Sequence, residues 1–408
     1  DPETNMYYLH LFAPQQPDLN WKNPKLRDDV YRMMTWWCDK GVDGFRMDVI
    51  SMISKDQSFP DYPKTDGRKY YTGKYHSNGP RLHEFIHEMN REVLSKYDCM
   101  TVGEAPGSTP EVARLFTDPE REELNMIFTF EHMNIDRIPG SVNRKWELKP
   151  FDLRDLKRVM SEWQNKLYNK GWNALYFENH DQPRIISRWG NDTTYREECA
   201  KAYATVLHGM QGTPYVYQGE EIGMTNVQFP LEEYEDIEVR NAYQDLVVKN
   251  KTISEDDFRK AVWNKSRDNA RVPMQWDDSE NAGFTTGKPW FRLSDRYQEI
   301  NVKKALEKND SVFYYYKDLI CLRHEEELLT EGDYQLLLPE DEKIFAYLRT
   351  SDKEQWIVVA NLSEDTVSTE GLVKYVSDKK DIKIANYKDR TGIKADLRPY
   401  EAFMMRIR

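Results

Sequence analysis

Three acidic residues stand out in this sequence, because each follows a short apolar stretch of the kind that forms a buried strand. Asp48 follows a stretch that begins at Val42, and Glu104 and Asp181 stand in comparable places further along the chain. Retaining hydrolysis of a glycosidic bond needs one ionised carboxylate as nucleophile and one protonated carboxyl about 5–5.5 Å away as acid/base. Strand ends are rigid enough to hold such groups. A single acid of this kind more often caps a helix or pairs with an arginine, so the repeated placement is what favours catalysis.

The first of these acids has a cation beside it. Arg46 lies two residues before Asp48, so strand alternation places both side chains on the same side of the strand expected over 41–50. A neighbouring positive charge favours the ionised form of a carboxyl, which is the form that a nucleophile needs. An Arg-x-Asp triplet is common on protein surfaces, and by itself it is a weak signal.

The elements around the acids alternate between helix and strand. Asn23 and Pro24 predict the start of a helix, and Gly41 predicts its end. Such alternation favours a parallel sheet, and polar residues at the carboxyl ends of successive strands are typical of a (β/α) barrel active site. Residues 51–79 are polar and rich in Gly and Pro, which predicts a long functional loop. The expected strands are 41–50, 99–104, 124–131, 174–181 and 213–218, and the expected helices include 24–40, 82–93 and 153–167.

From about residue 333 the apolar residues recur with a period of two instead. The segments that alternate in this way are separated by clusters of turn residues, and they predict a small antiparallel β domain. They are 334–338, 344–348, 356–361 and 402–407. The expected fold class is therefore α/β, with a TIM-type (β/α) barrel followed by a C-terminal antiparallel β domain.

Composition narrows the classes of partner. The 408 residues carry a net charge of −12, which argues against nucleic acid or an anionic membrane as a partner. The four cysteines form no Cys-x-x-Cys pair, which favours reduced core residues of a cytosolic protein over a disulfide or zinc framework. No apolar run approaches the roughly 20 residues of a membrane helix. No metal ion or other cofactor is expected from the residues present.

Three stretches resemble signature regions of the α-amylase family of glycoside hydrolases. They are Gly-Phe-Arg-Met-Asp-Val at 44–49, Val-Gly-Glu-Ala-Pro-Gly at 102–107 and Asn-His-Asp-Gln-Pro-Arg at 179–184. These match the second, third and fourth signature regions of that family. Because all three occur in the family's order, the resemblance is specific.

The resemblance implies a role for each matched residue. By position, Asp48 would be the nucleophile and Glu104 the general acid/base, with Asp181 as the third acid that grips sugar hydroxyls. Arg46 would steady the nucleophile, and His180 would bind the same sugar ring. Arg184 closes the fourth region and is expected among the substrate-binding residues.

Further stretches are similar to the oligo-1,6-glucosidase and dextran glucosidase subgroup, namely 219–226, 266–276 and 397–403. In that subgroup Val49, directly after the nucleophile, goes with α-1,6 linkages, where α-1,4 enzymes tend to carry Thr. Arg271 matches an arginine that holds the non-reducing end of the terminal glucose. The resemblance therefore implies an exo-acting, retaining α-1,6-glucosidase whose partner is a small oligosaccharide, expected to be a cytoplasmic monomer.

One departure from the family is large. Its first signature region, an Asp-x-x-x-Asn-His stretch, is not found in this chain. The chain is therefore expected to be truncated at its N-terminus and to hold barrel strands four to eight, so that alone it would be inactive. The calcium-binding loop of some relatives would also lie upstream. The expected domains are a remnant of an inserted domain over 1–20, the catalytic barrel over 21–332 and the all-β domain over 333–408.

Several alternatives remain open. A sucrose isomerase carries Arg-Leu-Asp-Arg-Asp after the sixth strand, where residues 134–138 keep only the Ile/Leu-Asp-Arg core. A maltase-like α-1,4 activity and a non-catalytic ancillary protein are the others, and the latter would lack an intact set of acids. Val49 could alternatively be only a core residue, because β-branched residues suit strands. Glu131, Glu178 and Glu220 are expected to be structural acids, and Trp276 and Trp290 are expected to pack in a core.

Overall fold

The computed structural model describes residues 3–60, 73–375, 381–393 and 395–408. Two compact units make up the chain. The first holds the residues up to Glu131 together with Lys166–Ala174, and the second holds His132–Asn165 and Leu175–Arg408.

A parallel sheet of three strands carries the first unit. Its strands are β1 (Gly44–Met47), β2 (Met100–Glu104) and β3 (Met126–Phe128), in the order β1-β2-β3. β1 pairs with β2 from Gly44 opposite Met100 to Met47 opposite Gly103. The two strands therefore end side by side, and this register brings the residue after β1 and the last residue of β2 to the same edge of the sheet.

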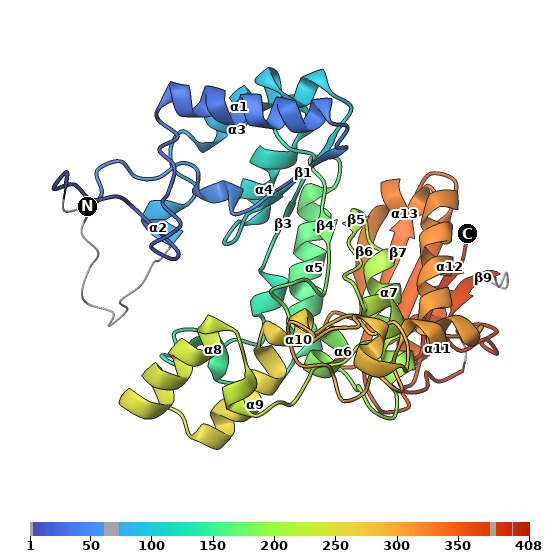
Figure 1. Cartoon of the computed structure of the whole chain (residues 1–408). Coiled ribbons are helices and arrows are strands. Elements are labelled where there is room, and N and C mark those ends of the chain that lie inside the picture. Colours follow the sequence, from blue (N-terminus) through green and yellow to red (C-terminus); the bar gives the residue numbers. More distant parts are fainter. Residues whose placement is uncertain (1–2, 61–72, 376–380, 394) are drawn as a thin grey trace. The chain divides into compact units, whose positions relative to one another are not determined.

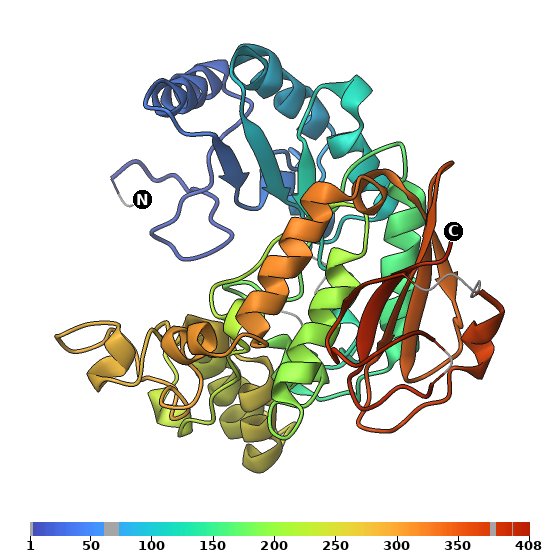
Figure 2. The same ribbon diagram turned by 90° about the vertical axis from the view of Figure 1, so that its right-hand side faces the viewer.

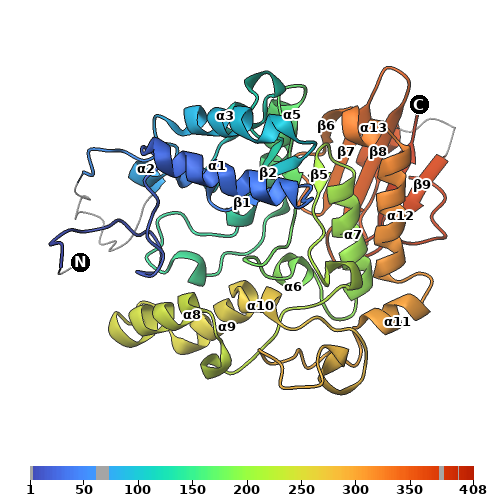
Figure 3. The same ribbon diagram turned by 45° about the horizontal axis from the view of Figure 1, so that its top comes forward.

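Helices α1 and α3 lie side by side in this unit (Figures 1 and 3). An ion pair joins them, because Arg27 Nε of α1 donates to Glu88 Oε2 of α3 at 2.6 Å. α1 begins as its sequence predicts, since the Asn23 side chain accepts a hydrogen bond from the amide of Lys25. The helices of the unit are α1 (Pro24–Asp39), α2 (Gly73–His76), α3 (Leu82–Glu92) and α4 (Pro110–Thr117), with 3₁₀ turns at Ile50–Met52, Leu94–Lys96 and Pro119–Arg121.

The second unit is mostly helical before its C-terminal sheet. The paired strands β4 (Ala174–Leu175) and β5 (Thr213–Pro214) are short, and α5 and β4 both cross the boundary between the units. The helices are α5 (Leu153–Leu167), α6 (Ile185–Trp189), α7 (Arg196–His208), α8 (Ile237–Ala242), the π-helix η9 (Tyr243–Lys249), α9 (Glu255–Lys265), α10 (Asp268–Arg271), α11 (Val302–Glu307), α12 (Val312–Glu325) and α13 (Leu328–Glu331). 3₁₀ turns lie at His132–Asn134, Arg144–Trp146, Glu220–Ile222, Leu231–Glu233, Glu280–Gly283 and Glu370–Tyr375.

The C-terminal sheet is antiparallel and has the order β6-β7-β8-β10-β9. Its strands are β6 (Asp333–Leu337), β7 (Ile344–Thr350), β8 (Gln355–Asn361), β9 (Asp381–Ala385) and β10 (Ala402–Arg406). Helices α7 and α12 run beside one another next to these strands (Figure 2). Nearly every residue of β7, β8 and β10 is buried, so both faces of the central strands are covered.

Some expectations for the strands were wrong. The strand expected over 41–50 is shorter and is not buried, because β1 is an edge strand of the described sheet and its residues are half-buried or exposed. Only two of the residues expected at 174–181 pair as β4, and the strand expected over 124–131 is shortened to β3. β9 was missed. Residues 61–72 of the expected loop 51–79 lie outside the described residues.

The cysteines and the long helices bear on two further expectations. All four cysteines are free, but only Cys38 and Cys199 are buried, while Cys99 is half-buried and Cys321 is exposed. The expectation of four core cysteines was therefore wrong for Cys321. Within the described part of the chain, no helix has the length and apolarity needed to cross a membrane.

Candidate active site

The first group of candidate residues lies at the carboxyl edge of the β1-β2-β3 sheet. Arg46 on β1 holds both acids at once: one guanidinium nitrogen donates to Asp48, and Nη2 donates to Glu104 Oε2 at 2.6 Å. The strand alternation predicted for Arg46 and Asp48 is confirmed by this contact. Arg46 therefore brings the two acids to the same edge of the sheet.

Glu104 is the acid whose protonation the site perturbs. Its side chain is 11% exposed, whereas that of Asp48 is 71% exposed. Burial, and after it the interaction with Asp48, raise the pKa of Glu104 to about 6, while the charge of Arg46 opposes the rise. The two carboxyls therefore have different surroundings: the buried Glu104 is suited to hold a proton, and Asp48 is exposed to solvent.

Val49 has a backbone conformation that is rare for a β-branched residue. Its φ is +37° and its ψ is 43°, in the left-handed region. This conformation turns the chain sharply after Asp48 and directs the Val49 amide towards Glu104 Oε2, at 3.4 Å. Strain of this kind is most often found where neighbouring contacts hold the backbone in place, as at functional sites. Val49 is half-buried.

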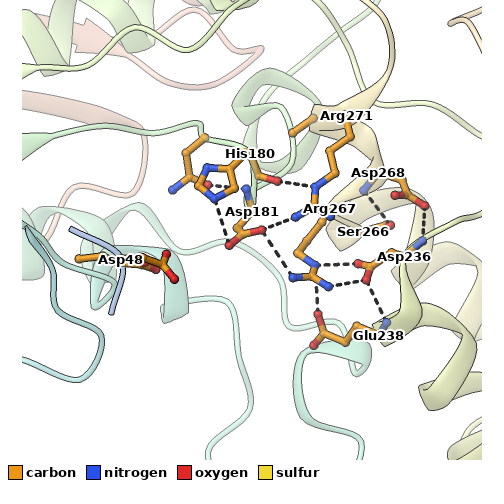
Figure 4. A network of polar contacts seen from close by, with 12 residues as sticks. Asp48, His180, Asp181, Asp236, Glu238, Ser266, Arg267, Asp268 and Arg271 are labelled. Atoms are coloured by element: carbon orange, nitrogen blue, oxygen red, sulfur yellow. Dashed lines mark hydrogen bonds and ion pairs between the residues drawn. The ribbon is translucent and has the colours of Figure 1, made fainter. Parts of the chain in front are cut away.

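The second group belongs to the second unit and surrounds Asp181 (Figure 4). The Asp181 amide donates to the Asn179 side chain at 2.7 Å, which fixes a tight turn after β4. His180 Nε2 lies 3.5 Å from Asp181 Oδ2. Arg271 points at the same turn, because it pairs with Asp181 Oδ1 and its Nε donates to the His180 carbonyl at 2.9 Å. His180, Asp181 and Arg271 are thus brought together.

Arg267 also contacts this group and was missed from the sequence. Its Nη1 lies 3.6 Å from Asp181 Oδ1, and Figure 4 shows it beside Arg271. The signal was present, because Arg267 and Arg271 are four residues apart, a spacing that places two side chains on one face of a helical turn. Both lie in the stretch 266–276 that carries the family resemblance.

A buried acid holds Arg267 in place. Asp236 is 3% exposed and accepts two hydrogen bonds from the guanidinium of Arg267, one of them from Nε at 2.9 Å. Asp236 also caps α8 by accepting from the Glu238 amide. Glu238 in turn accepts from Lys145 at 2.6 Å. Alternating charges therefore lead from Asp181 through Arg267 to the start of α8, and each charge has an opposite neighbour.

Arg184 does not lie where a substrate-binding residue would. Its side chain is 1% exposed, and its Nη1 donates to Glu178 Oε2 at 3.0 Å and to the Gln218 carbonyl at 2.8 Å. The expectation of direct substrate contact was wrong, because the turn at 180–182 sends the Arg184 side chain into the core. Trp276 and Trp290 are 50% and 61% exposed, so the expectation that they pack in a core was wrong as well.

The described residues form no metal site. Among them, no three His, Cys, Asp or Glu side chains are arranged to hold a metal ion. The candidate residues themselves offer carboxyls, guanidinium groups and one imidazole.

Two family models match the chain. Residues 1–332 match the catalytic domain of α-amylase, and residues 334–378 match the C-terminal domain of maltogenic amylase.

Individual proteins and structures are similar over nearly the whole chain. The oligo-1,6-glucosidase of Heyndrickxia coagulans is 60% identical over 402 residues, which cover 98% of this chain and 72% of that protein. The crystal structure of trehalose-6-phosphate hydrolase from Bacillus licheniformis is 44% identical with a TM-score of 0.89, over 99% of this chain and 72% of that chain. Isomaltulose synthase from Klebsiella sp. LX3 is 38% identical with a TM-score of 0.91, over 100% of this chain and 73% of that chain.

Proposed function

Because this chain belongs to the α-amylase family of glycoside hydrolases, we propose that it is an exo-acting, retaining α-glucosidase that cleaves α-1,6 bonds of isomalto-oligosaccharides. It is a hydrolase of α-glucosidic bonds, and several of its relatives are named oligo-1,6-glucosidases. The observation that carries the residue assignment is the arrangement of Asp48 and Glu104 around Arg46, with the pKa of Glu104 raised to about 6.

The proposed reaction has two steps. Glu104 donates its proton to the glycosidic oxygen while an Asp48 carboxylate oxygen attacks the anomeric carbon, so the leaving sugar departs with a new hydroxyl. Glu104, now ionised, then takes a proton from water as the water oxygen attacks the anomeric carbon and displaces Asp48. Two displacements at one carbon restore the α configuration.

Charged neighbours support this division of roles. Arg46 donates a hydrogen bond to Asp48, and its charge opposes protonation of Glu104, but the burial of Glu104 outweighs that opposition. We assign Asp181 as the third acid, which binds sugar hydroxyls, and His180 and Arg271 as residues that bind the terminal glucose. Val49, directly after Asp48, is assigned to linkage preference.

Sucrose isomerisation is the second candidate, because isomaltulose synthases are similar in fold. Residues 134–138 match only the Ile-Asp-Arg core of the isomerase motif, with Asn134 and Ile138 where that motif has Arg and Asp, which favours hydrolysis. Asp136 is 2% exposed and accepts hydrogen bonds from Arg188 at 2.7 and 2.8 Å, so its carboxylate is part of a buried ion pair. Hydrolysis is therefore favoured over transfer to fructose, and an α-1,4 preference is less favoured because Val stands at position 49.

The remaining expectations are proposals of the same kind. Five strands, β1 to β5, precede the C-terminal sheet in the described residues, and we propose that they correspond to barrel strands four to eight. We also propose a catalytic barrel over 21–332 and an all-β domain over 333–408. We propose a cytoplasmic enzyme, which fits the four free cysteines. We also propose that it is a monomer, which light scattering can test. The proposal that it needs no cofactor can be tested by measuring activity in the presence of a chelator.

A covalent label tests the proposed mechanism directly. The full-length protein should be treated with an activated 2-deoxy-2-fluoro-α-glucosyl donor, which slows release of the glucosyl enzyme, and then digested for mass spectrometry. The label is expected on the peptide that contains Asp48, and proton NMR of isomaltose hydrolysis should show α-glucose as the first product. A label on another residue would overturn the assignment of Asp48. β-Glucose as the first product would overturn the retaining mechanism.

A further inference from the structure

One buried carboxylate, that of Glu178, accepts hydrogen bonds from the far end of the segment that carries His180 and Asp181. Glu178, just before the segment, accepts through Oε1 from the amide of Ile185, just after it, at 2.8 Å. Its other oxygen, Oε2, accepts from Arg184 Nη1 at 3.0 Å. Both ends of the turn are thereby tied to one side chain, which is 2% exposed.

Arg184 completes this tie and is itself held on several sides. Its Nη1 also donates to the Gln218 carbonyl at 2.8 Å, and its backbone amide donates to the Asn226 side chain at 2.8 Å. The guanidinium lies 5.1 Å from the centre of the Tyr217 ring. Because an unpaired buried charge is costly, Arg184 and Glu178 depend on one another for their positions.

The middle of the segment has its own support. The Asp181 amide donates to the Asn179 side chain, and the side chain of Gln182 accepts from Arg188 Nη1 at 3.0 Å. Arg188 is fixed in turn by Asp136, in an ion pair whose side chains are 4% and 3% exposed. The backbone around Asp181 is therefore attached on both sides to buried ion pairs.

Around the ion pair of Glu178 and Arg184, acidic side chains outnumber basic ones. Two further carboxyls lie near this pair, because Glu220 feels the charges of Glu178 and Arg184, and Glu178 feels the charge of Glu221. Glu220 is 5% exposed and accepts from the Tyr217 amide at 3.0 Å and from the Tyr316 hydroxyl at 2.8 Å. An ion pair with Arg184 needs only Glu178. The additional acids nearby favour a polar cluster that fixes the position of the Glu178 and Arg184 side chains.

We propose that Glu178 is a positioning residue for the reaction: it holds the segment 179–184 so that the Asp181 carboxylate and His180 meet the substrate in one geometry. This inference rests on the proposed function, since it needs Asp181 to act on the sugar. Glu178 touches no reacting atom and acts through Asp181. Its loss shifts the segment, and misplacement of a catalytic group by about 1 Å can cost on the order of 100-fold in rate.

Glu178→Gln is the informative change. Glutamine keeps the shape of the side chain but has a single oxygen, so it can accept from Ile185 or from Arg184, and its amide group opposes the other donor. The expected result is a fall in kcat of roughly 10- to 100-fold on isomaltose, with KM changed by less than about threefold. The kcat effect dominates because Asp181 contributes most in the transition state.

A double-mutant cycle separates positioning from general destabilisation. In an Asp181→Asn background, Glu178→Gln should lower kcat by about twofold or less, because the group through which it acts is already lost. An aryl α-glucoside keeps this background measurable. Glu401→Gln is the matched control, because Glu401 is also fully buried and accepts from a guanidinium and a backbone amide, both of Arg398. It should lower Tm without changing kcat on isomaltose.

The outcomes are distinct. Full additivity of Glu178→Gln and Asp181→Asn, or equal loss of kcat in Glu401→Gln, would overturn the positioning role and leave the proposed function intact. Near-normal activity of Asp181→Asn alone would instead remove Asp181 from the reaction, and the positioning role with it. If Glu178→Gln does not fold, Arg184→Lys supports the same cycle, because lysine keeps the charge but cannot reach Glu178 and the Gln218 carbonyl together.

Discussion

Replacing Arg46 by glutamine should shift the pH range in which this enzyme works. The Arg46 guanidinium is 2.6 Å from Glu104 and opposes protonation of that carboxyl. In the wild type, Glu104 is protonated below about pH 6, so kcat/KM for isomaltose should fall as the pH rises above that value. Without the cation, the ionised form of Glu104 loses its stabilising neighbour. Its pKa should therefore rise, and the fall in kcat/KM should begin at a higher pH.

The size of the shift follows from Coulomb's law. Two unit charges about 4 Å apart interact by about 1 kcal/mol in water and about 4 kcal/mol at an effective dielectric constant of 20. At about 1.36 kcal/mol per pH unit, these limits correspond to about 0.7 and 3 pH units. The Arg46 side chain is 35% exposed and the Glu104 side chain is 11% exposed. Partial screening by solvent places the expected shift at about 1–2 pH units. The alkaline limb of the profile, where kcat/KM falls as the pH rises, should therefore move to about pH 7–8.

The assay is kcat/KM against pH from 4.5 to 9.5, with isomaltose and with p-nitrophenyl α-glucoside. Isomaltose needs a proton from Glu104 to expel its leaving sugar, whereas p-nitrophenolate leaves without one, so the limb should be steep only for isomaltose. Arg46→Lys keeps the charge and is the control whose limb should stay near that of the wild type. A limb that stays in place in Arg46→Gln, or moves to lower pH, would refute this account of Glu104.

Three other changes have expected outcomes. Asp48→Asn should cut turnover by several orders of magnitude with an unchanged circular dichroism spectrum, and near-normal turnover would remove Asp48 from the nucleophile's role. Val49→Thr should lower the ratio of isomaltose to maltose hydrolysis by tens of fold, since single contacts discriminate by about 1–3 kcal/mol; an unchanged ratio would make Val49 a packing residue. Glu220 keeps its proton to about pH 8 when folded, against an ordinary value of 4.5. Its contribution to stability is therefore lost as the pH rises through 8, so Tm should fall less between pH 6 and 9 in Glu220→Gln than in the wild type, as measured by calorimetry.

Local signals in the sequence were sufficient where the structure depends on neighbours along the chain. Asn23 predicted the start of α1 because a cap needs only the amides that follow it. The contact between Arg46 and Asp48 was predictable because alternation in a strand fixes the side on which a residue lies. The fold class followed from the order of these elements, and the family models agree with it.

Contacts between distant residues explain what was missed. Arg184 sits in a family motif, but its burial depends on Gln218 and Asn226, more than thirty residues away. Asp236 could not be connected with Arg267 from the sequence, because the segment between them folds back on itself through α8 and α9. β9 is an exception, because its described neighbour β10 is the next strand along the chain, and Ile382 and Ile384 alternate with polar residues.

The C-terminal sheet is joined to the helices of the second unit by buried cations that bind backbone carbonyls. Lys157 of α5 donates to the carbonyls of Leu338 and Asp341 at 2.6 and 2.5 Å, and it also reaches that of Ile344, at the start of β7. Arg349 of β7 donates in the opposite sense, to the Gly209 carbonyl after α7 at 2.6 Å.

These bonds bear on how such proteins can be recombined. A C-terminal sheet exchanged with that of a relative would bring new carbonyls to Lys157 and would remove the cation from Gly209, so a buried charge or carbonyl would lose its partner on each side. We therefore expect this sheet to be inherited together with α5 and α7 as one block. In chimaeras, productive crossover points should fall outside that block, although the change in hydrophobic periodicity near residue 333 suggests a natural place to cut.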